Sequence, residues 1–178
     1  TNPWVDWAGY PNYNDPQNIK DQIRAVERGK LYPYVETVDA YRCPESKKDQ
    51  ARCYSIPDYM GNERHNGHET FGGLEAVLKT TQLNNASSRI VFLDEDDITF
   101  GGFTVYYGDD SWWDWTPTRH NDGVTLGYAD GHAGYYKWRD DRTVKYGKEK
   151  NFGKKATYGE NNQDLLFIQR GIYGSPGY

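Results

Sequence analysis

The sequence predicts an α+β domain in which an N-terminal helix is followed by a set of antiparallel β-strands. Three observations lead to this expectation. Residues 15–29 carry the start, face and stop signals of a helix. Short apolar runs between residues 89 and 138 are separated by Gly, Asn and Asp, as in strands that are joined by turns. Aromatic residues make up 16% of the chain, which also holds 19 Gly and 8 Pro, and this composition favours a turn-rich β region.

The length of 178 residues suits one domain with a core of its own. Only 36% of the residues are hydrophobic, so we expect a thin core and half-exposed tyrosines that a partner could cover. The formal net charge of −5 gives no reason to expect nucleic acid, and no run of roughly 18 apolar residues could span a bilayer. The chain begins at Thr1, which leads us to expect that a preceding segment was removed.

The first helix is expected over residues 15–29. Asp15 can accept a hydrogen bond at the N-cap, Pro16 suits the first turn, and Gly29 can end the helix. One face carries the apolar residues Ile19, Ile23 and Val26. A second, shorter helix is predicted over residues 73–79, where one face carries Leu74, Val77 and Leu78.

Two apolar runs predict strands before the closing hairpin. Residues 89–93, RIVFL, form a continuous apolar run of the buried-strand type, and four acidic residues follow it directly. Residues 103–107, FTVYY, lie between glycine-containing turns and predict a second strand. We expect a two-stranded ribbon in this second region.

Residues 123–138 predict a β-hairpin. Residues 123–129 alternate between polar and apolar side chains, and residues 132–138 return as HAGYYKW. Asp130-Gly131 lies between them and is a strong signal for a tight turn with positive φ at both positions. The pair therefore has a backbone explanation that needs no catalytic Asp130.

The two cysteines, Cys43 and Cys53, lie ten positions apart in CPESKKDQARC. A redox pair would have two intervening residues, and a metal site would have further Cys or His nearby. We interpret the pair as a structural disulfide, which would contribute about 2–3 kcal/mol and imply an oxidising, extracytoplasmic setting. Two reduced thiols in the core are the alternative.

Charge is divided between two segments. All charged residues of segment 94–114 are acidic, whereas Lys and Arg predominate in segment 139–155. We expect segment 139–155 to be exposed and poorly structured, and the apolar run 165–168 to dock on the domain or on a neighbouring subunit. Solvated faces are the ordinary explanation for such segregation, and a head-to-tail contact between subunits is the alternative.

Acidic and histidine side chains raise the question of a metal site. His120 and His132 would lie roughly 20–30 Å apart along a regular hairpin, so a shared zinc ion is not expected. Closely spaced carboxylates suit calcium, with a solvated acidic loop as the alternative. Two or three of the four candidate ligands can converge, because neighbouring strand residues face opposite sides. The candidates are Asp94, Glu95, Asp96 and Asp97.

Other chemical signals are sparse. The sequence contains neither GxSxG nor HExxH nor a glycine-rich phosphate loop, so we expect no enzyme and keep a hydrolase as a distant third hypothesis. Asn85 begins an Asn-Ala-Ser triplet and is a candidate glycosylation site. Tryptophans beside a carboxylate are typical of sugar-binding β modules, although a core or subunit interface uses the same residues. The candidate sugar platform is Trp112, Trp113 and Trp115.

A pattern of His120, nine residues and then Asp130-Gly131 resembles the signature of the prepilin-type processing-associated proteins, a family of pilin-like or pseudopilin-like bacterial proteins. Residues 29–46, GKLYPYVETVDAYRCPES, are similar to the family's Leu-x-Pro-Tyr followed by Tyr-x-Cys-Pro. Residues 87–97, SSRIVFLDEDD, resemble its strand ending in Asp-Glu, and residues 119–138 cover its closing hairpin. The matches follow the family's order along most of the chain.

The resemblance implies a pilin-like fold, with the N-terminal helix packed on an antiparallel sheet, a disulfide-closed loop and an extended C-terminal tail. It implies a globular domain over 1–138 and a docking tail over 139–178. The family's basic leader and long hydrophobic helix have no counterpart in the 178 residues. The implied function is that of a non-enzymatic subunit of a type IV pilus-like or pseudopilus-like filament, outside the cell or at its surface, that assembles with itself. A secreted carbohydrate-binding module is the alternative.

Within this resemblance the motif residues have an architectural interpretation. Arg119 and His120 can donate hydrogen bonds to Asp94-Glu95 at the end of a neighbouring strand. We therefore expect a polar clamp that fixes the hairpin against the sheet, with Asp130 and Gly131 forming the turn at its other end.

Overall fold

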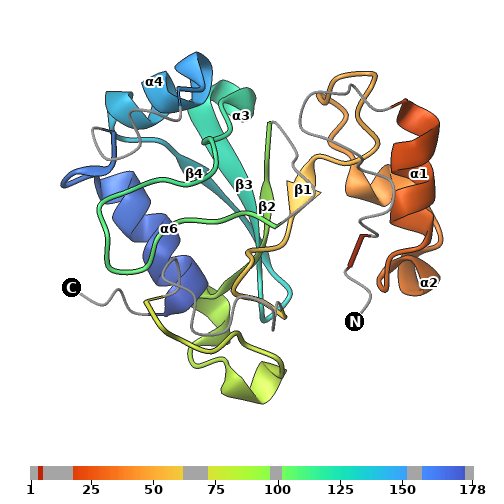
Figure 1. Cartoon of the computed structure of the whole chain (residues 1–178), viewed down its shortest axis with the longest axis horizontal. Helices are drawn as coiled ribbons and strands as arrows, with labels where there is room; N and C mark the ends of the chain where they lie inside the picture. The colour runs from red at the N-terminus through yellow and green to blue at the C-terminus, as the bar shows by residue number, and fades with distance from the viewer. Residues whose placement is uncertain (1–3, 6–17, 62–71, 97–101, 152–157, 175–178) are drawn as a thin grey trace. The chain divides into compact units, whose positions relative to one another are not determined.

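The computed structural model describes residues 4–5, 18–61, 72–96, 102–151 and 158–174 (Figure 1). The chain divides into two compact units. Unit 1 comprises Thr1–Tyr54 with Asp97–Gly101, and unit 2 comprises Ser55–Asp96 with Gly102–Tyr178. This division differs from the predicted boundary at residue 138. Within the described ranges, no helix has both the length and the apolar character needed to cross a membrane.

Unit 1 is built around the predicted N-terminal helix. Helix α1 spans Ile19–Glu27, and the Asn18 side chain caps it by accepting a hydrogen bond from the Lys20 N–H at 2.7 Å. The predicted cap, Asp15, lies outside the described residues. Helix α2 (Tyr32–Val35) and the 3₁₀ turn η2 (Val38–Tyr41) follow. The buried face of α1 belongs to this unit's own small core, which consists of Val5, Ala25, Val26 and Tyr41.

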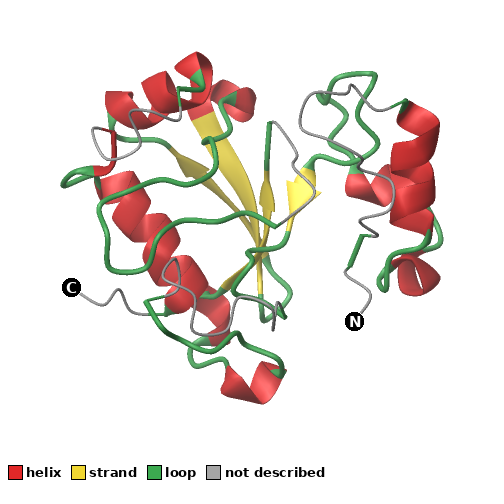
Figure 2. Ribbon diagram, in the orientation of Figure 1, coloured by secondary structure: helices red, strands yellow, loops and turns green. Residues whose placement is uncertain are grey.

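Unit 2 contains most of the four-stranded sheet, in which the strands lie in the order β1-β2-β3-β4 (Figure 2). The strands are β1 (Tyr54–Ser55), β2 (Ile90–Asp94), β3 (Gly123–Tyr128) and β4 (Ala133–Lys137). Strands β2 and β3 are antiparallel, with Leu93 opposite Leu126, and β3 and β4 form the predicted hairpin. The α+β class and the strands at 89–93 and 123–138 are therefore confirmed.

The helix that packs on the sheet within unit 2 is C-terminal. Helix α6 (Gln163–Tyr173) lies against β2 and contributes Leu165, Ile168 and Ile172 to the main core (Figure 1). Gly171 faces Ile90 so closely that a Cβ atom there would overlap the isoleucine side chain. Within this unit, a helix from the predicted tail therefore packs on the sheet.

The remainder of the predicted tail is also folded where it is described. Helix α4 (Asp141–Glu149) begins at Asp140, whose carboxylate accepts a hydrogen bond from the Arg142 N–H at 2.9 Å. Tyr146 of α4 is fully buried in the main core. We expected a poorly structured segment because it is highly charged. The charged side chains of α4 lie on its outer face, however, and the opposite face carries a few apolar residues that are buried in the core.

Two other predicted elements differ from the structure. Residues 73–79 do not form a helix, because the Val77 N–H donates to the Tyr59 carbonyl at 2.9 Å and Gly61 N–H donates to the Val77 carbonyl at 2.8 Å. Residues 103–107 do not join the sheet. They are extended and make isolated bridges, Phe103 with Pro57 and Val105 with Trp112.

The predicted disulfide is wrong, because no disulfide bond joins Cys43 and Cys53, and both thiols are buried. The Cys43 N–H donates to the Cys53 sulfur at 2.6 Å, and the Cys53 N–H donates to the Tyr41 carbonyl at 2.9 Å. One main-chain hydrogen bond and one hydrogen bond from a backbone N–H to a sulfur therefore close this loop. The disulfide was the residue-based reason to expect an oxidising compartment, so the expected location outside the cell now depends on the family resemblance.

Candidate functional site

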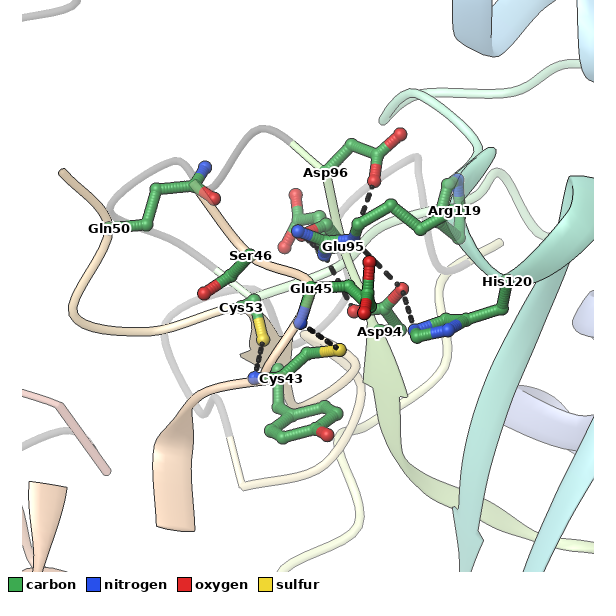
Figure 3. A network of polar contacts seen from close by, with 12 residues as sticks. Cys43, Glu45, Ser46, Gln50, Cys53, Asp94, Glu95, Asp96, Arg119 and His120 are labelled. Carbon is green, nitrogen blue, oxygen red and sulfur yellow. Dashed lines mark hydrogen bonds and ion pairs between the residues drawn. The ribbon is translucent and has the colours of Figure 1, made fainter. Parts of the chain in front are cut away.

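The acidic end of β2 meets Arg119 at the base of the β3–β4 hairpin (Figure 3). The Arg119 Nη2 atom lies 2.6 Å from Asp94 Oδ1 and donates to the Glu95 carbonyl at 2.7 Å. Its Nε atom lies 3.0 Å from Asp96 Oδ1. The arginine thus joins two carboxylates and one backbone carbonyl. We call Asp94, Asp96, Arg119 and His120 the polar clamp.

His120 approaches the same strand end from the neighbouring position. Its Nε2 atom lies 3.4 Å from Asp94 Oδ2 (Figure 3). The structure therefore brings Arg119 and His120 together with Asp94, which are the contacts expected from the motif. The Asp96 carboxylate also accepts hydrogen bonds from the Thr118 N–H at 2.9 Å and from its hydroxyl at 3.3 Å.

The backbone that presents His120 is left-handed. Segment α3 (Arg119–Asp122) has φ of 58° at His120, 60° at Asn121 and 55° at Asp122. His, Asn and Asp are enriched in this region among non-glycine residues, but each such residue still costs roughly 1–2 kcal/mol. Contacts from β4 hold the turn: the Tyr135 hydroxyl donates to the His120 carbonyl and the Lys137 ammonium donates to the Asn121 carbonyl, both at 2.9 Å.

The electrostatics of the polar clamp are dominated by burial. The Asp94 side chain is 0% exposed, and burial raises the pKa of its carboxyl group above the ordinary value. The neighbouring Arg119 guanidinium lowers this pKa and so opposes the effect of burial. Because a buried carboxylate without a cation would be costly, Arg119 is what allows Asp94 to be ionised at the end of the strand.

Glu95 points to a different partner from its two neighbours. The Ser55 hydroxyl donates to a Glu95 carboxylate oxygen, whereas Asp94 and Asp96 contact Arg119. Of the four candidate calcium ligands, Glu95 is thus separated from Asp94 and Asp96, and Asp97 lies outside the described residues. In the part of the chain that the structure describes, no group of three or more His, Cys, Asp or Glu could hold a metal ion. Calcium at Asp94 and Asp96 would require Arg119 to move.

Asp130 and Gly131 lie at the tip of the hairpin and do not contact the polar clamp. The Gly131 N–H donates to the Tyr128 carbonyl and the Tyr128 N–H donates to the His132 carbonyl, each at 2.9 Å. Gly131 has φ of 94°, but Asp130 does not have a positive φ. The turn is therefore a three-residue connection with one left-handed glycine, and the predicted two-residue primed turn is wrong.

The Asp130 carboxylate serves the same turn. It accepts hydrogen bonds from the His132 N–H at 3.2 Å and from His132 Nδ1 at 2.6 Å. These hydrogen bonds hold the pKa of the Asp130 carboxyl below its ordinary value. His120 and His132 thus have separate acidic partners, at opposite ends of β3.

The three tryptophans do not form a sugar platform. Trp112 is 0% exposed and lies in the main core, where its ring stacks on Tyr146 and meets the edge of Trp138. Trp115 is half-buried, with the Lys150 ammonium 5.6 Å from its ring centre. Trp113 is 38% exposed, and the Tyr106 ring meets it edge to face. The sequence run WWDW could not show that adjacent tryptophans face opposite sides of the chain.

Asn85 lies on the surface in a left-handed conformation, and its carbonyl accepts a hydrogen bond from the Ser88 N–H at 2.8 Å. Its side chain is therefore accessible to modification, as the Asn-Ala-Ser triplet requires.

Sequence reasoning missed a further buried carboxylate, Asp164. It accepts hydrogen bonds from the Arg139 N–H at 3.0 Å, the Asp140 N–H at 3.0 Å and the Tyr136 hydroxyl at 3.0 Å. Burial together with the neighbouring Asp164 raises the pKa of Tyr136 to about 12. The sequence signal that could have indicated this site is Asn162, an N-cap residue two positions before Asp164. Its side chain caps α6 by accepting a hydrogen bond from the Asp164 N–H at 2.8 Å.

Comparisons with known proteins do not identify the chain. No family model, no curated protein and no solved structure matches it.

Proposed function

We propose that this chain is a structural subunit of an extracellular pilus-like or pseudopilus-like helical filament that assembles through non-covalent contacts between copies. The proposal begins with the sequence resemblance to the prepilin-type processing-associated proteins. In such a subunit the His-x9-Asp-Gly motif serves the fold and not a reaction.

The observation that carries the proposal is the way the motif residues are used. At one end of β3, His120 and its neighbour Arg119 contact the buried Asp94 of β2. At the other end, Asp130 and Gly131 shape the turn into β4. The motif thus determines where the hairpin lies on the sheet and where it reverses, which are requirements of a rigid building block.

The exposed surface also supports an assembling subunit. Large apolar side chains are exposed at several positions, and aromatic residues of this kind are enriched in the buried centres of protein interfaces. The residues are Tyr34, Val35, Leu78, Trp113 and Tyr135. Single exposed apolar residues are common on monomers, so these residues support an assembling subunit only in combination with the motif.

Electron microscopy of the native protein tests the proposal directly. We expect helical filaments whose repeating unit accommodates both compact units of the chain. Assembly should also be followed by sedimentation as a function of protein concentration and salt, because exposed charges are screened beyond about 8 Å at 0.15 M salt while apolar burial is not. Protein that stays monomeric under all these conditions, and native material without filaments, would contradict the proposal.

Carbohydrate binding remains the alternative function, and the exposed Trp113 with its neighbour Tyr106 is the observation that favours it. Pull-down on insoluble polysaccharide tests it, with Trp113→Ala as the variant. Trp112→Ala is not a suitable control, since it would empty part of the core. Binding that is abolished by Trp113→Ala in a folded monomer would favour the alternative over the filament.

A further inference from the structure

Strand β4 forms one edge of the sheet, and the backbone groups on its outer side can be identified from the hairpin's hydrogen bonds. The Tyr128 N–H donates to the His132 carbonyl at 2.9 Å, and the Trp138 N–H donates to the Asp122 carbonyl at 3.1 Å. Bonded and non-bonded pairs alternate along an antiparallel ladder, so Gly134 and Tyr136 are the β4 residues that bond to β3. The outer N–H and C=O groups therefore belong to Ala133, Tyr135 and Lys137.

No described segment covers this outer side. Strand β4 is the last strand of the sheet, and none of its three outward residues makes a backbone hydrogen bond to another described segment. The side chains of all three are exposed, and Tyr135 is 52% exposed. An open edge of this kind can bind another strand through the same ladder that pairs β3 with β4.

The edge carries little of the protection that monomeric proteins use. Proteins block exposed edges with proline, inward-pointing charges, bulges or lysines. Strand β4 contains no proline and pairs with β3 in a regular register without a bulge. Its single lysine, Lys137, donates to the Asn121 carbonyl of its own hairpin at 2.9 Å and so turns back toward β3.

Charge along the hairpin favours a second copy in antiparallel orientation. The tip end carries Asp130, whose side chain is 38% exposed and whose carboxylate lies 2.6 Å from His132 Nδ1. The base end carries Lys137 and Arg139, while the nearby Asp140 is neutralised by Arg142 at 2.6 Å. In an antiparallel pair, the acidic tip of each hairpin lies beside the positively charged end of the other hairpin. A parallel copy would place like charges together.

The outward residues also fix the register. A two-fold axis allows several registers, but only the one centred on Tyr135, the middle of the three outward residues, pairs all three with outward residues of the second copy. With the axis there, Tyr135 faces Tyr135 of the second copy, and Ala133 of each copy faces Lys137 of the other. This register pairs every outward N–H and C=O of β4, while each Tyr135 hydroxyl keeps its hydrogen bond to the His120 carbonyl of its own hairpin.

We propose that β4 is a self-association edge at which two copies of this chain join antiparallel, about a two-fold axis through Tyr135, into a continuous sheet. The contact uses the same patch on both copies and closes on itself, so it produces pairs and does not by itself propagate a filament. It therefore stands or falls independently of the filament proposal, for which a second and different contact is needed.

Two variants of opposite charge test both the contact and its symmetry. In Tyr135→Glu and in Tyr135→Lys, two like charges face each other across the axis, so each variant should associate about tenfold or more weakly than the wild type. An equimolar mixture should recover association, because Glu then faces Lys. Sedimentation velocity over a concentration series measures all four samples. Variants that pair as well as the wild type, or a mixture that associates no better than the two variants separately, would overturn the proposal.

Hydrogen exchange of the wild-type protein provides a test that does not depend on any variant. The amides of Gly134 and Tyr136 should be protected at all concentrations, because they bond to β3. The amides of Ala133, Tyr135 and Lys137 should exchange rapidly in dilute protein and slowly in concentrated protein. Fast exchange of these three amides at the highest soluble concentration would overturn the proposal, whether or not filaments are found. Unchanged protection of Gly134 and Tyr136 also shows that the two Tyr135 variants remain folded.

Discussion

The two ends of the β3–β4 hairpin each pair an aspartate with a histidine, yet the two pairs differ in every physical respect. At the base, Asp94 is fully buried and Arg119 balances its charge, with His120 beside it. At the tip, Asp130 and His132 are both exposed and contact each other over a distance of two residues. The Asp–His pair at the base of the hairpin joins elements that are far apart in sequence, whereas the Asp–His pair at the tip only shapes a local turn. Residue type therefore says little about energetic importance until burial is known.

The largest expected effect comes from removing the cation at the base. Arg119→Met leaves the buried Asp94 carboxylate without its partner, and we expect the free energy of unfolding to fall by about 3 kcal/mol at neutral pH. Denaturant titration measures this loss. The double variant Arg119→Met/Asp94→Asn is the matched control and should recover part of the stability, because no buried charge remains. A double variant less stable than Arg119→Met would contradict this account.

The same variant should have a distinctive pH dependence. Burial already raises the pKa of Asp94 in the folded protein, and loss of Arg119 should raise this pKa further. A raised folded pKa favours the folded state at low pH, and this contribution is lost as pH rises through the folded pKa. The stability deficit of Arg119→Met should therefore be smallest below about pH 4 and grow as pH rises. A deficit that is the same at all pH values would show that Asp94 is not its cause.

The hairpin tip should be most sensitive at its glycine. Gly131→Ala introduces a Cβ at φ of 94°, where no other atom lies within 4 Å of the new carbon. The cost is therefore conformational, about 1–2 kcal/mol, and independent of pH. Thermal unfolding should show this loss without any change in the salt dependence. An unaffected melting temperature would mean that the turn readily adopts another conformation.

At the base, His120 combines a contact with a strained backbone. His120→Ala removes the contact to Asp94 and retains the left-handed conformation, so we expect a loss of about 1 kcal/mol. His120→Gly removes the same contact but relaxes the backbone and should be the more stable of the two. The difference between the two variants isolates the strain. If His120→Ala changes neither the melting temperature nor the yield of filaments, the histidine is not part of the polar clamp.

The smallest effect is expected at the exposed pair of the tip. Asp130→Asn retains an acceptor for the His132 N–H and loses only a solvent-screened ion pair. We expect no measurable change in melting temperature at neutral pH, in contrast to Arg119→Met. A destabilisation comparable to that of Arg119→Met would mean that burial does not explain the difference between the two ends of the hairpin.

Local signals in the sequence were sufficient for elements whose stability is local. The hairpin was predicted from Asp130-Gly131 and the alternating pattern around it, and β2 from its apolar run followed by acids. The contact between Arg119 and Asp94 was anticipated from the motif. The turn type was not predicted correctly, because it depends on whether one or two residues adopt positive φ, and both conformations accept the same residues.

Long-range packing decided the rest. The charged segment that contains α4 folds because Tyr146 reaches the main core, and α6 packs on the sheet because Leu165, Ile168 and Ile172 fit against β2. The predicted helix at 73–79 was displaced by backbone pairing with Tyr59 and Gly61. The cysteine spacing allowed a disulfide, but one main-chain hydrogen bond and one N–H···S hydrogen bond close that loop. The sequence by itself determined which residues could form turns, strands and charge pairs. Only the tertiary structure decided which of them are buried, because the free energy of a charge, a tryptophan or a helix face depends on what surrounds it.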